Sequence, residues 1–303
     1  MLPTLLRYLP ALLPLLAMAP APAQVTGVAH VVVIGVDGLG PIGIEKAPTP
    51  NIDRLIAGGA STMKARGVMP TVSSPNWASM IMGAGPEQHG VLSNDWPKPE
   101  GFLDPSTKGP GGIFPTIFGI LRQQRPDAYI AVVHDWDDFG RLVEPDTANT
   151  FINADGPDET AARAIQLIKD HKPALLFLHF DHVDHELHGV GFATQPYFDA
   201  VAKMDRLTGD ILEALEEAGI AESTAVLLTS DHGGAGKSHG GITPDEFTIP
   251  WILQGPGVAH GTTIEDTVNT FDTAATIAYL LGIERPQCWI GRPVMGAFSQ
   301  SKP

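Results

Sequence analysis

The stretch that decides the fold is HVVVIGVDG, residues 30–38. Its first seven residues are nearly all apolar and mostly β-branched, which is typical of a strand buried on both faces of a parallel sheet. We expect this strand to end at Asp37 and Gly38. Taken alone, an acid at such a point is often only a turn former or a helix cap. The nearby glycines do not match the G-x-G-x-x-G pattern of dinucleotide-binding proteins.

Three further apolar stretches have the same form, and helical patterns separate them. The strands are expected at residues 128–133, 174–180 and 225–229, each followed by ligand-capable groups: His134-Asp135, Asp181 and Ser230-Asp231-His232. The helices are expected at 51–57, 75–82, 116–124, 159–170, 197–217 and 272–282. This alternation predicts an α/β fold with a mainly parallel central sheet and helices on both faces. Because ligands bind at the carboxyl ends of such strands, we expect the polar groups to form a site there.

The composition limits the classes of function. The 303 residues are 43% hydrophobic and 17% charged, which fits a folded chain. A formal net charge of −15 disfavours nonspecific binding to nucleic acid, because that needs a positive field. The single cysteine, Cys288, excludes an internal disulfide and a cysteine-based zinc site, so any metal must be bound by histidine, carboxylate or hydroxyl groups.

The N-terminus has the character of a secretory signal. Residues 2–18 are dominated by Leu, Ala and Pro, carry Arg7 as their only charge, and run into a small-residue stretch. We predict a signal peptide over residues 1–23 and a single catalytic domain over 24–303, exported to the periplasm or secreted. Four prolines interrupt the apolar run, so a stable membrane span after cleavage is not expected. The alternative is an uncleaved membrane tether. Residues 95–112 are predicted to form a long surface loop near the site.

Two interpretations remain open for the segment PTVSSPNW, residues 70–77. Ser73 or Ser74 can simply cap the helix that the following proline begins. Alternatively, Ser73 sits at the positive N-terminus of that helix, where an alkoxide and an anionic substrate are both stabilised.

Two histidine-rich segments predict metal ligation. Residues 180–189, FDHVDHELHG, place six ionisable groups in eight positions after a buried strand. Unpaired groups of this kind are costly near a core, whereas imidazole and carboxylate suit zinc. The spacing alone does not choose between Asp181 with His185 and Asp184 with His188. The second segment places Asp231 and His232 at a strand end, with His239 in the glycine-rich loop that follows.

Taken together, these segments resemble the alkaline phosphatase superfamily, and most closely its nucleotide pyrophosphatase/phosphodiesterase branch. The resemblance extends from residue 31 to residue 293. Five motifs follow in the family's order: residues 70–77, 85–94 (GPEQHGVLSN), 184–191 (DHELHGVG), 230–233 (SDHG) and 238–241 (SHGG). In the family, the histidine of the Asp-x-x-x-His pair is followed three residues later by a glycine. Only His188, with Gly191, satisfies this spacing, so the resemblance selects Asp184 with His188.

The resemblance implies two divalent metal ions, which we expect to be Zn²⁺ because the ligands are rich in histidine. One ion would be bound by Asp184, His188 and His239, and the other by Asp37, Asp231, His232 and the Ser73 oxygen. The resemblance further implies that Ser73 is the nucleophile of a two-step phosphoryl transfer through a covalent intermediate. Asn94 would contact a phosphoryl oxygen.

The function implied is that of an exported metal-dependent phosphodiesterase or nucleotide pyrophosphatase acting on a small-molecule phosphoester. The branch usually has threonine where Ser73 stands. Sulfatases of the superfamily use a C/S-x-P-x-R frame, and here Trp77 stands in the arginine position, which disfavours sulfate esters. No arginine matches the one that binds phosphate monoesters in alkaline phosphatases, although a lysine or arginine of residues 95–172, such as Lys98 or Arg122, could supply that charge.

Two alternatives to this function stay open: a phosphomonoesterase on the same fold, and a noncatalytic metal-binding protein. The remaining polar residues near the strand ends, which are Asp135, Asp181, His182 and His185, are candidates for orienting the ligands, without assigned roles.

Overall fold

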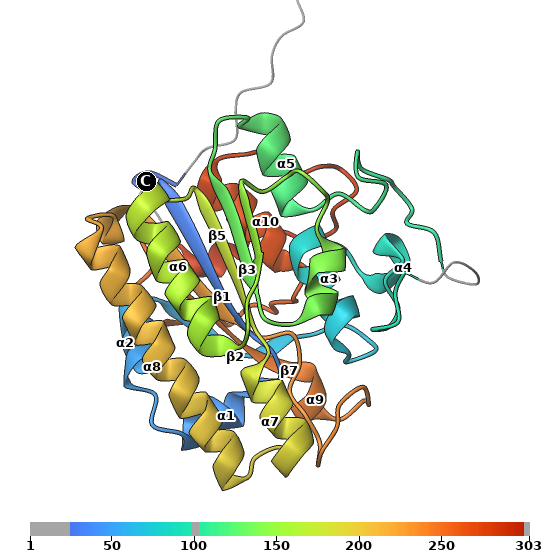
Figure 1. The fold of residues 1–303 in the computed structure, drawn as a ribbon, viewed down its shortest axis with the longest axis vertical. Coiled ribbons are helices and arrows are strands. Elements are labelled where there is room, and N and C mark those ends of the chain that lie inside the picture. Colours follow the sequence, from blue (N-terminus) through green and yellow to red (C-terminus); the bar gives the residue numbers. More distant parts are fainter. Residues whose placement is uncertain (1–24, 98–102, 300–303) are drawn as a thin grey trace, which may run out of the picture.

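A single eight-stranded sheet forms the centre of the molecule in a computed structural model of the chain (Figure 1). The structure describes residues 25–97 and 103–299. The predicted signal peptide, residues 1–23, and Lys98 therefore lie outside the described residues. Within the described ranges, no helix is long and apolar enough to cross a membrane.

The strands follow the order β4-β3-β5-β1-β6-β7-β2-β8 across the sheet. All neighbouring strands are parallel except that β7 runs against both β6 and β2. The prediction of a mainly parallel α/β sheet is therefore confirmed. The strands are β1 (His30–Val36), β2 (Ala60–Arg66), β3 (Ile130–His134), β4 (Thr150–Asn153), β5 (Leu175–Phe180), β6 (Thr224–Thr229), β7 (Thr248–Gln254) and β8 (Thr262–Thr263).

Helices cover both faces of this sheet, as predicted (Figure 1). The α-helices are α1 (Pro41–Lys46), α2 (Pro50–Gly58), α3 (Ser73–Met82), α4 (Pro86–His89), α5 (Ile117–Gln124), α6 (Pro157–His171), α7 (His182–Val190), α8 (Gln195–Glu217), α9 (Pro244–Phe247) and α10 (Asp272–Leu281). Three short 3₁₀ turns complete the described elements: η1 (Asp137–Leu142), η2 (Ala221–Ser223) and η3 (Met295–Ala297).

Two hydrophobic cores lie on opposite faces of the sheet, and β1 contributes to both. Val31 and Val33 pack into the core formed with α3, α5 and α10, whereas Val32 and Ile34 pack into the core formed with α1, α2, α6, α7 and α8. Successive side chains of a strand point to opposite faces, so a strand buried on both faces must be apolar at every position. This requirement explains the continuous apolar run of residues 31–34.

The four predicted strands are neighbours in space, in the order β3-β5-β1-β6. Their parallel pairing is continuous, and His134 of β3 lies beside His179 of β5 in register. The carboxyl ends of all four strands therefore meet at one edge of the sheet. The polar residues that follow them are brought together there.

Sequence reasoning missed strand β7, and its proline explains why. Pro250 lies inside the strand, and a proline lacks the N–H that an interior strand donates. In the structure, β6 pairs with β7 only from Trp251 onward, and the pairing with β2 shifts register between Thr62 and Ala65, opposite Pro250. The bulge thus accommodates the missing donor within an interior strand.

Helix α2 is held against α8 by one buried carboxylate. Asp205 Oδ1 accepts hydrogen bonds from the backbone N–H groups of Asn51 (2.9 Å) and Ile52 (2.8 Å), and Oδ2 accepts from Asn51 Nδ2 (3.0 Å). These are first-turn N–H groups, which have no partner within their own helix. The acid of α8 therefore acts as a tertiary N-terminal cap for α2.

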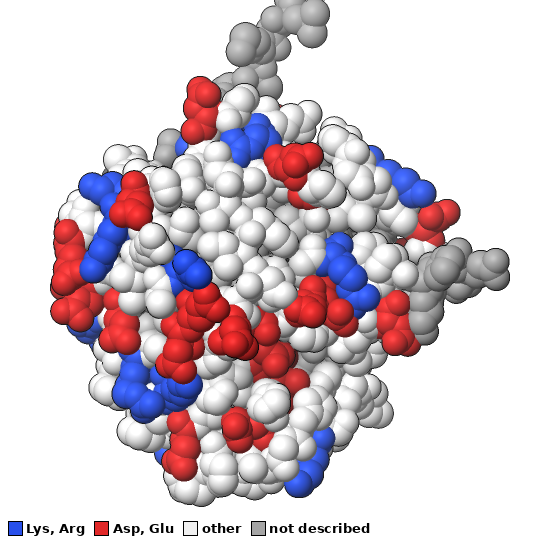
Figure 2. Space-filling model, in the orientation of Figure 1, with Lys and Arg blue, Asp and Glu red and all other residues white. Residues whose placement is uncertain are grey.

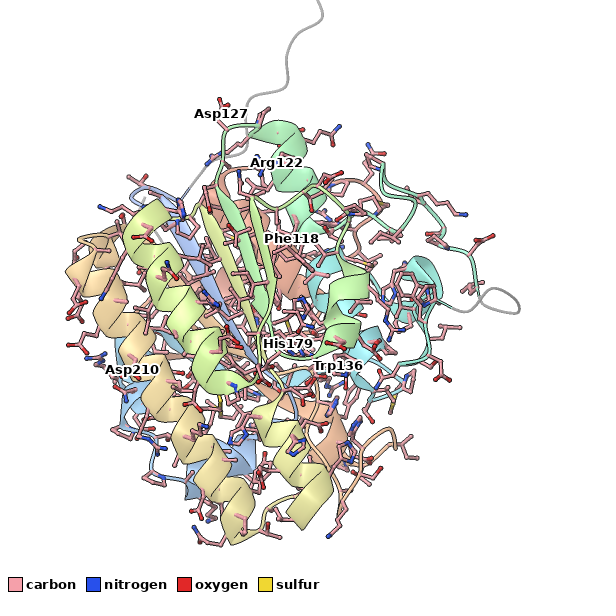
Figure 3. The ribbon with its side chains drawn as sticks, viewed as in Figure 1. Phe118, Arg122, Asp127, Trp136, His179 and Asp210 are labelled. Carbon is pink, nitrogen blue, oxygen red and sulfur yellow. The ribbon has the colours of Figure 1, made fainter. Side chains whose placement is uncertain are left out.

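We expect Asp205→Ala to lower the free energy of unfolding by about 2–4 kcal/mol, because it leaves the buried donors of Asn51 and Ile52 unsatisfied. Urea denaturation measures the change. Asp210→Ala is the matched control, since Asp210 is exposed on the same helix (Figure 3) and should change stability by less than about 0.5 kcal/mol. Equal losses in the two variants would contradict the capping role.

Candidate active site

Asp37 follows β1 directly and its side chain is buried, 1% exposed. Its Oδ2 atom accepts hydrogen bonds from Trp77 Nε1 (2.8 Å) and His179 Nε2 (3.3 Å). Burial alone would raise the pKa of Asp37, but these donors and the nearby His232 lower it to about 2. The side chain is therefore an ionised carboxylate in the interior. It caps no helix, because α1 begins at Pro41 with Gly40 as its N-cap.

The turn after Asp37 brings this acid close to α7. Gly38 has φ +71°, and a Cβ atom there would lie 2.9 Å from the Cα atom of Asp184. The Tyr197 hydroxyl holds the turn, since it donates to the Gly38 carbonyl and accepts from the Gly40 N–H, each at 3.0 Å. Only glycine fits this position, and its small size allows the two acids to approach each other.

Ser73 is the first residue of α3 and is 4% exposed. The N-cap of this helix is Val72, and no side chain makes the capping hydrogen bond. The helix-capping interpretation of Ser73 and Ser74 is therefore wrong for this structure. The Ser73 Oγ atom lies 3.2 Å from His232 Nε2 instead, at the positive end of the helix.

Asn76, within the first turn of α3, fixes the loop that leads into Ser73. Its amide nitrogen donates to the carbonyl of Val72 (2.9 Å), and its Oδ1 atom accepts from the N–H of Val68 (2.6 Å). The amide is fully buried, so these bonds are made without competition from water. They set the position at which the chain enters the helix and presents Ser73.

Asn94 lies beside Ser73 in the same cleft. Its Oδ1 atom accepts a hydrogen bond from the Ser74 N–H at 2.8 Å, and its own backbone carbonyl accepts from Arg141 Nη2 at 2.9 Å. Because the amide oxygen is engaged with α3, the amide nitrogen is the group left to donate toward a molecule in the cleft.

Three histidines are oriented so that their Nε2 atoms face carboxylates. The Nδ1 atom of each donates to a backbone carbonyl oxygen, at 3.0 Å for His188, 2.9 Å for His239 and 2.8 Å for His232. A carbonyl only accepts, so in the neutral ring Nδ1 carries the proton and Nε2 carries the lone pair. This is the arrangement of a histidine that ligates a metal through Nε2.

The first cluster joins α7 to the loop after β6. Asp184 and His188 are four residues apart and therefore share one face of α7, with His188 Nε2 3.2 Å from Asp184 Oδ2. His239 Nε2 lies 3.1 Å from His188 Nε2 and 3.7 Å from Asp184 Oδ1. The hydrogen bond to Asp184 raises the pKa of His188 to about 8, so a proton on this ring joins the two nitrogens. A divalent cation bound by the same three side chains would take the place of that proton.

The second cluster lies at the ends of β1 and β6, next to Ser73. His232 Nε2 is 3.3 Å from Asp37 Oδ1 and 3.2 Å from Asp231 Oδ2. Burial, followed by the charges of Asp37 and Asp184, raises the pKa of Asp231 well above its usual range. Carboxylates packed this closely need a compensating positive charge.

The acceptors of both clusters fit divalent cations. Asp37 Oδ1, Asp184 Oδ1 and Asp231 Oδ2 are buried and have no hydrogen-bond partner among the described residues. Single ligand atoms of Asp184, His188 and His239 lie within 4.8 Å of one another, which is the first predicted ligand set. Those of Asp37 and His232 lie within the same distance of Asp184 rather than of Asp231, so Asp184 stands between the two clusters. Buried acceptors without donors are rare, and a bound metal would satisfy them.

His179 is a site residue that sequence reasoning missed. It is fully buried in β5, with Nε2 toward Asp37 Oδ2 (3.3 Å) and Nδ1 toward Asp135 Oδ1 (3.6 Å). Burial by itself would lower its pKa, but the two carboxylates raise it to about 10. The one available signal was a histidine within the apolar stretch LLFLHF, residues 175–180.

The other polar residues near the strand ends have different surroundings. Asp181 lines the cleft, and its N–H donates to Asp135 Oδ1 at 2.6 Å. Burial, with the charges of Asp37 and Asp184, raises the pKa of Asp181 to about 7. His185 also lines the cleft, whereas His182 does not.

Ser73 opens into a cleft of about 260 Å³. Its lining is Ser73, Asn94, Trp136, Asp181, Asp184, His185, His188 and His239, with neither lysine nor arginine among these described residues. The surface around this end of the sheet carries gathered acidic side chains (Figure 2).

Arg122 does not contribute charge to the cleft. Its guanidinium group donates to backbone carbonyls, including those of Thr147 and Ala128, and it lies at the opposite end of the sheet from His179 and Trp136 (Figure 3). The expectation that Arg122 could supply charge to the site is therefore wrong, because this helix end faces away from the strand ends.

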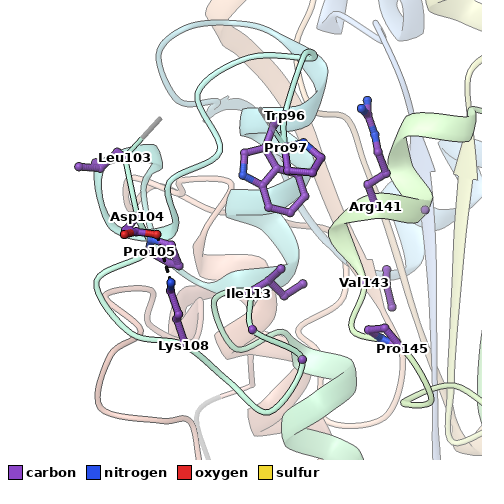
Figure 4. A pocket seen from close by; sticks show the side chains of 13 residues that line it. Trp96, Pro97, Leu103, Asp104, Pro105, Lys108, Ile113, Arg141, Val143 and Pro145 are labelled. Atoms are coloured by element: carbon purple, nitrogen blue, oxygen red, sulfur yellow. Dashed lines mark hydrogen bonds and ion pairs between the residues drawn. The ribbon is translucent and has the colours of Figure 1, made fainter. Parts of the chain in front are cut away.

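A larger groove of about 690 Å³ lies beside the cleft (Figure 4). Trp96, Ile113 and Val143 give it apolar walls, and Arg141 and Lys108 add positive charge. Arg141 connects the groove to the cleft through its hydrogen bond to the Asn94 carbonyl. Part of the predicted surface loop, residues 95–112, thus forms the wall of a cavity.

A protein-family model decides the relationship: residues 31–247 match the model described as type I phosphodiesterase / nucleotide pyrophosphatase. The chain belongs to this family. The match covers more than half of the chain and includes every residue of the two clusters, together with Ser73 and Asn94. This family is part of the alkaline phosphatase superfamily.

Curated relatives of this phosphodiesterase family member come from two branches of the superfamily. The rat (Rattus norvegicus) steryl-sulfatase is 35% identical over 139 residues, which cover 38% of this chain and 24% of the relative. The mouse (Mus musculus) ectonucleotide pyrophosphatase/phosphodiesterase family member 1 is 26% identical over 196 residues, covering 61% of this chain and 21% of the relative. The matches thus span about a fifth to a quarter of the length of these relatives.

Solved structures show the same fold. Murine ectonucleotide pyrophosphatase/phosphodiesterase 5 superposes with a TM-score of 0.71 at 15% identity, covering 84% of this chain and 95% of that chain. A 2-O GAG sulfatase superposes with a TM-score of 0.72 at 16% identity, covering 90% of this chain and 75% of that chain. The fold is therefore shared by phosphodiesterase-type and sulfatase-type proteins.

We expect His188→Ala to weaken zinc binding by at least about tenfold, because it removes an inward Nε2 lone pair from the first cluster. Metal content after dialysis, measured by elemental analysis, tests this. His185→Ala is the matched control, since His185 lies on the same helix but outside both clusters. Greater metal loss in the His185 variant would favour the alternative register with Asp181.

Proposed function

We propose that this protein is an exported, metal-dependent phosphodiesterase or nucleotide pyrophosphatase with Ser73 as its nucleophile. The observation that carries the proposal is the position of Ser73 Oγ, 3.2 Å from His232 Nε2, beside buried acceptors that have no donor. The family membership supports phosphoester chemistry. Export and the extent of the catalytic domain, residues 24–303, rest on the sequence pattern of the N-terminus.

The donor set supports two divalent cations, which we propose to be Zn²⁺. One would be held by Asp184, His188 and His239. The other would be held by Asp37, Asp231, His232 and Ser73. Bound there, the cations would supply Lewis-acid polarisation and neutralise developing negative charge.

The chain's own groups then account for a two-step reaction. Ser73 Oγ, as the alkoxide, forms a bond to phosphorus while the bond to the leaving ester oxygen breaks, and the leaving oxygen takes a proton from water. A second water molecule then attacks phosphorus as the Oγ–P bond breaks. Its oxygen leaves on the phosphoryl product, and one of its protons passes to Ser73 Oγ. Throughout, the Asn94 amide nitrogen is placed to donate to a nonbridging oxygen.

The charge and shape of the cleft favour a diester over a monoester. A diester carries one negative charge on its phosphoryl group, whereas a monoester carries up to two and gains more from an added cation. The described cleft lining contains neither lysine nor arginine. The adjoining groove also offers space for a second ester substituent.

Three alternatives follow from particular observations. A phosphomonoesterase on the same fold would use the same nucleophile and cations. A sulfatase is suggested by the relatives in that branch, but Trp77, in the arginine position of the sulfatase frame, is buried against Asp37. A noncatalytic metal-binding protein would retain the clusters, but it would have no use for a nucleophile open to the cleft.

We expect Ser73→Ala to lower kcat by at least about a thousandfold while leaving metal content largely intact, because the variant loses the nucleophile and keeps the acids and histidines. Steady-state hydrolysis of bis(p-nitrophenyl) phosphate measures this. Ser74→Ala is the matched control, since its interaction with Asn94 is made by the backbone N–H and survives the change. Full activity in the Ser73 variant would remove serine from the mechanism.

Substrate class is tested with bis(p-nitrophenyl) phosphate, p-nitrophenyl phosphate and p-nitrophenyl sulfate under identical conditions. We expect the highest kcat/KM for the diester, because no described cationic side chain lines the cleft to match a doubly charged monoester. A large preference for the monoester would establish the phosphomonoesterase instead. Turnover of the sulfate ester alone would establish a sulfatase, and zinc binding without any turnover would establish the noncatalytic protein.

A further inference from the structure

We propose that His179 is a positioning residue that fixes which oxygen of Asp37 faces the second cation site. The inference rests on the proposed function, because it concerns the carboxylate assigned there to a cation. His179 does not itself line the cleft, and its hydrogen bond to the candidate ligands is made to Asp37.

The two oxygens of Asp37 have different surroundings. Oδ2 accepts two hydrogen bonds, from Trp77 Nε1 (2.8 Å) and His179 Nε2 (3.3 Å). Oδ1 has no hydrogen-bond partner among the described residues and lies 3.3 Å from His232 Nε2. Two donors on Oδ2 hold the carboxylate group in one orientation, in which Oδ1 would be the oxygen that faces a cation.

His179 is itself locked in place by packing and charge. Trp77, Trp136 and Phe139 surround its ring, with ring centroids 4.6, 5.9 and 4.9 Å away. Its Nδ1 atom faces Asp135 Oδ1 at 3.6 Å, so the ring lies between two carboxylates. Within an enclosed aromatic cage the ring has no room to turn, and its Nε2 donor stays directed at Asp37.

The sheet order makes this arrangement possible. Asp135 follows β3, His179 lies near the end of β5, and Asp37 follows β1, and these are three adjacent strands. The resulting row Asp135–His179–Asp37 crosses the sheet edge beneath the cleft. Within this row, His179 donates a hydrogen bond to Asp37, which is a candidate metal ligand. Hydrogen-bonded partners of this kind generally orient the metal ligands of proteins.

The test compares His179→Phe with His179→Gln. Phenylalanine keeps the aromatic packing and removes both nitrogens, whereas glutamine keeps an amide donor near the position of Nε2. His134→Phe is the matched control, because His134 is the buried register neighbour of His179 on β3 and its Nδ1 atom donates to the Trp136 carbonyl rather than to Asp37. Thermal unfolding first establishes that each variant is folded.

Zinc affinity is then measured by competition with a chromophoric chelator. We expect His179→Phe to weaken one of two zinc equivalents by about 10–100-fold, and His179→Gln to recover most of that loss. The His134 control should keep the affinity of the wild type. A folded His179→Phe variant with two zinc equivalents of unchanged affinity would overturn the proposal, as would an equal loss in the glutamine variant.

Kinetics provide a second readout that a merely structural role would not produce. With bis(p-nitrophenyl) phosphate, we expect His179→Phe to lower kcat more than it changes KM, and excess Zn²⁺ to restore part of kcat. If the wild type binds zinc but hydrolyses no phosphoester, the proposed function fails. The zinc affinities of the variants still decide the role of His179 in that case.

Discussion

The mutual repulsion of carboxylates at the carboxyl edge of the sheet is the constraint on which the site depends. Asp37, Asp184 and Asp231 are buried within one small volume, and each has an oxygen atom without a donor. Burying unpaired charge is costly, so the fold needs positive charge at this point. The protonated ring of His179 supplies one such charge beside Asp37. The acceptors that remain face the Nε2 atoms of His188, His232 and His239, and imidazole with carboxylate is a ligand set that fits divalent cations.

The surrounding structure holds these acids in place despite their repulsion. Tyr197 clamps the turn after Asp37, and the backbone N–H of Gly38 donates to Asp231 Oδ1 at 3.2 Å. Trp77, which stands where the sulfatase frame has arginine, donates to Asp37. One side chain of α3 thus supports a candidate metal ligand, while the first residue of the same helix is the proposed nucleophile. The two candidate groups are therefore joined through one helix of ten residues.

The two branches of relatives have one structural frame in common. The sheet and helices superpose on phosphodiesterase-type and sulfatase-type structures alike, so the fold does not select the ester. Selection lies in the cleft lining and in the groove beside it, where Arg141 contacts the backbone of Asn94 rather than lining the cleft. The residues that line the cleft and the groove are therefore the ones to substitute when the substrate class is tested.

The sequence by itself determined the sheet class, the six long helices and the types of residue at the strand ends, because apolar periodicity and ligand chemistry are local properties. Of the eight strands it missed β2, β4, β7 and β8, and β7 contains Pro250, which a bulge opposite β2 accommodates. It also placed Arg122 near a site from which it faces away. The family resemblance implied the ligand sets, but only the tertiary structure decided how their residues come together in space. Local spacing allowed both Asp181 with His185 and Asp184 with His188, but the position of His239 on a distant loop places it with Asp184 and His188. His179 showed no sequence signal beyond one polar residue in an apolar strand, since its role depends on three strands being adjacent in space.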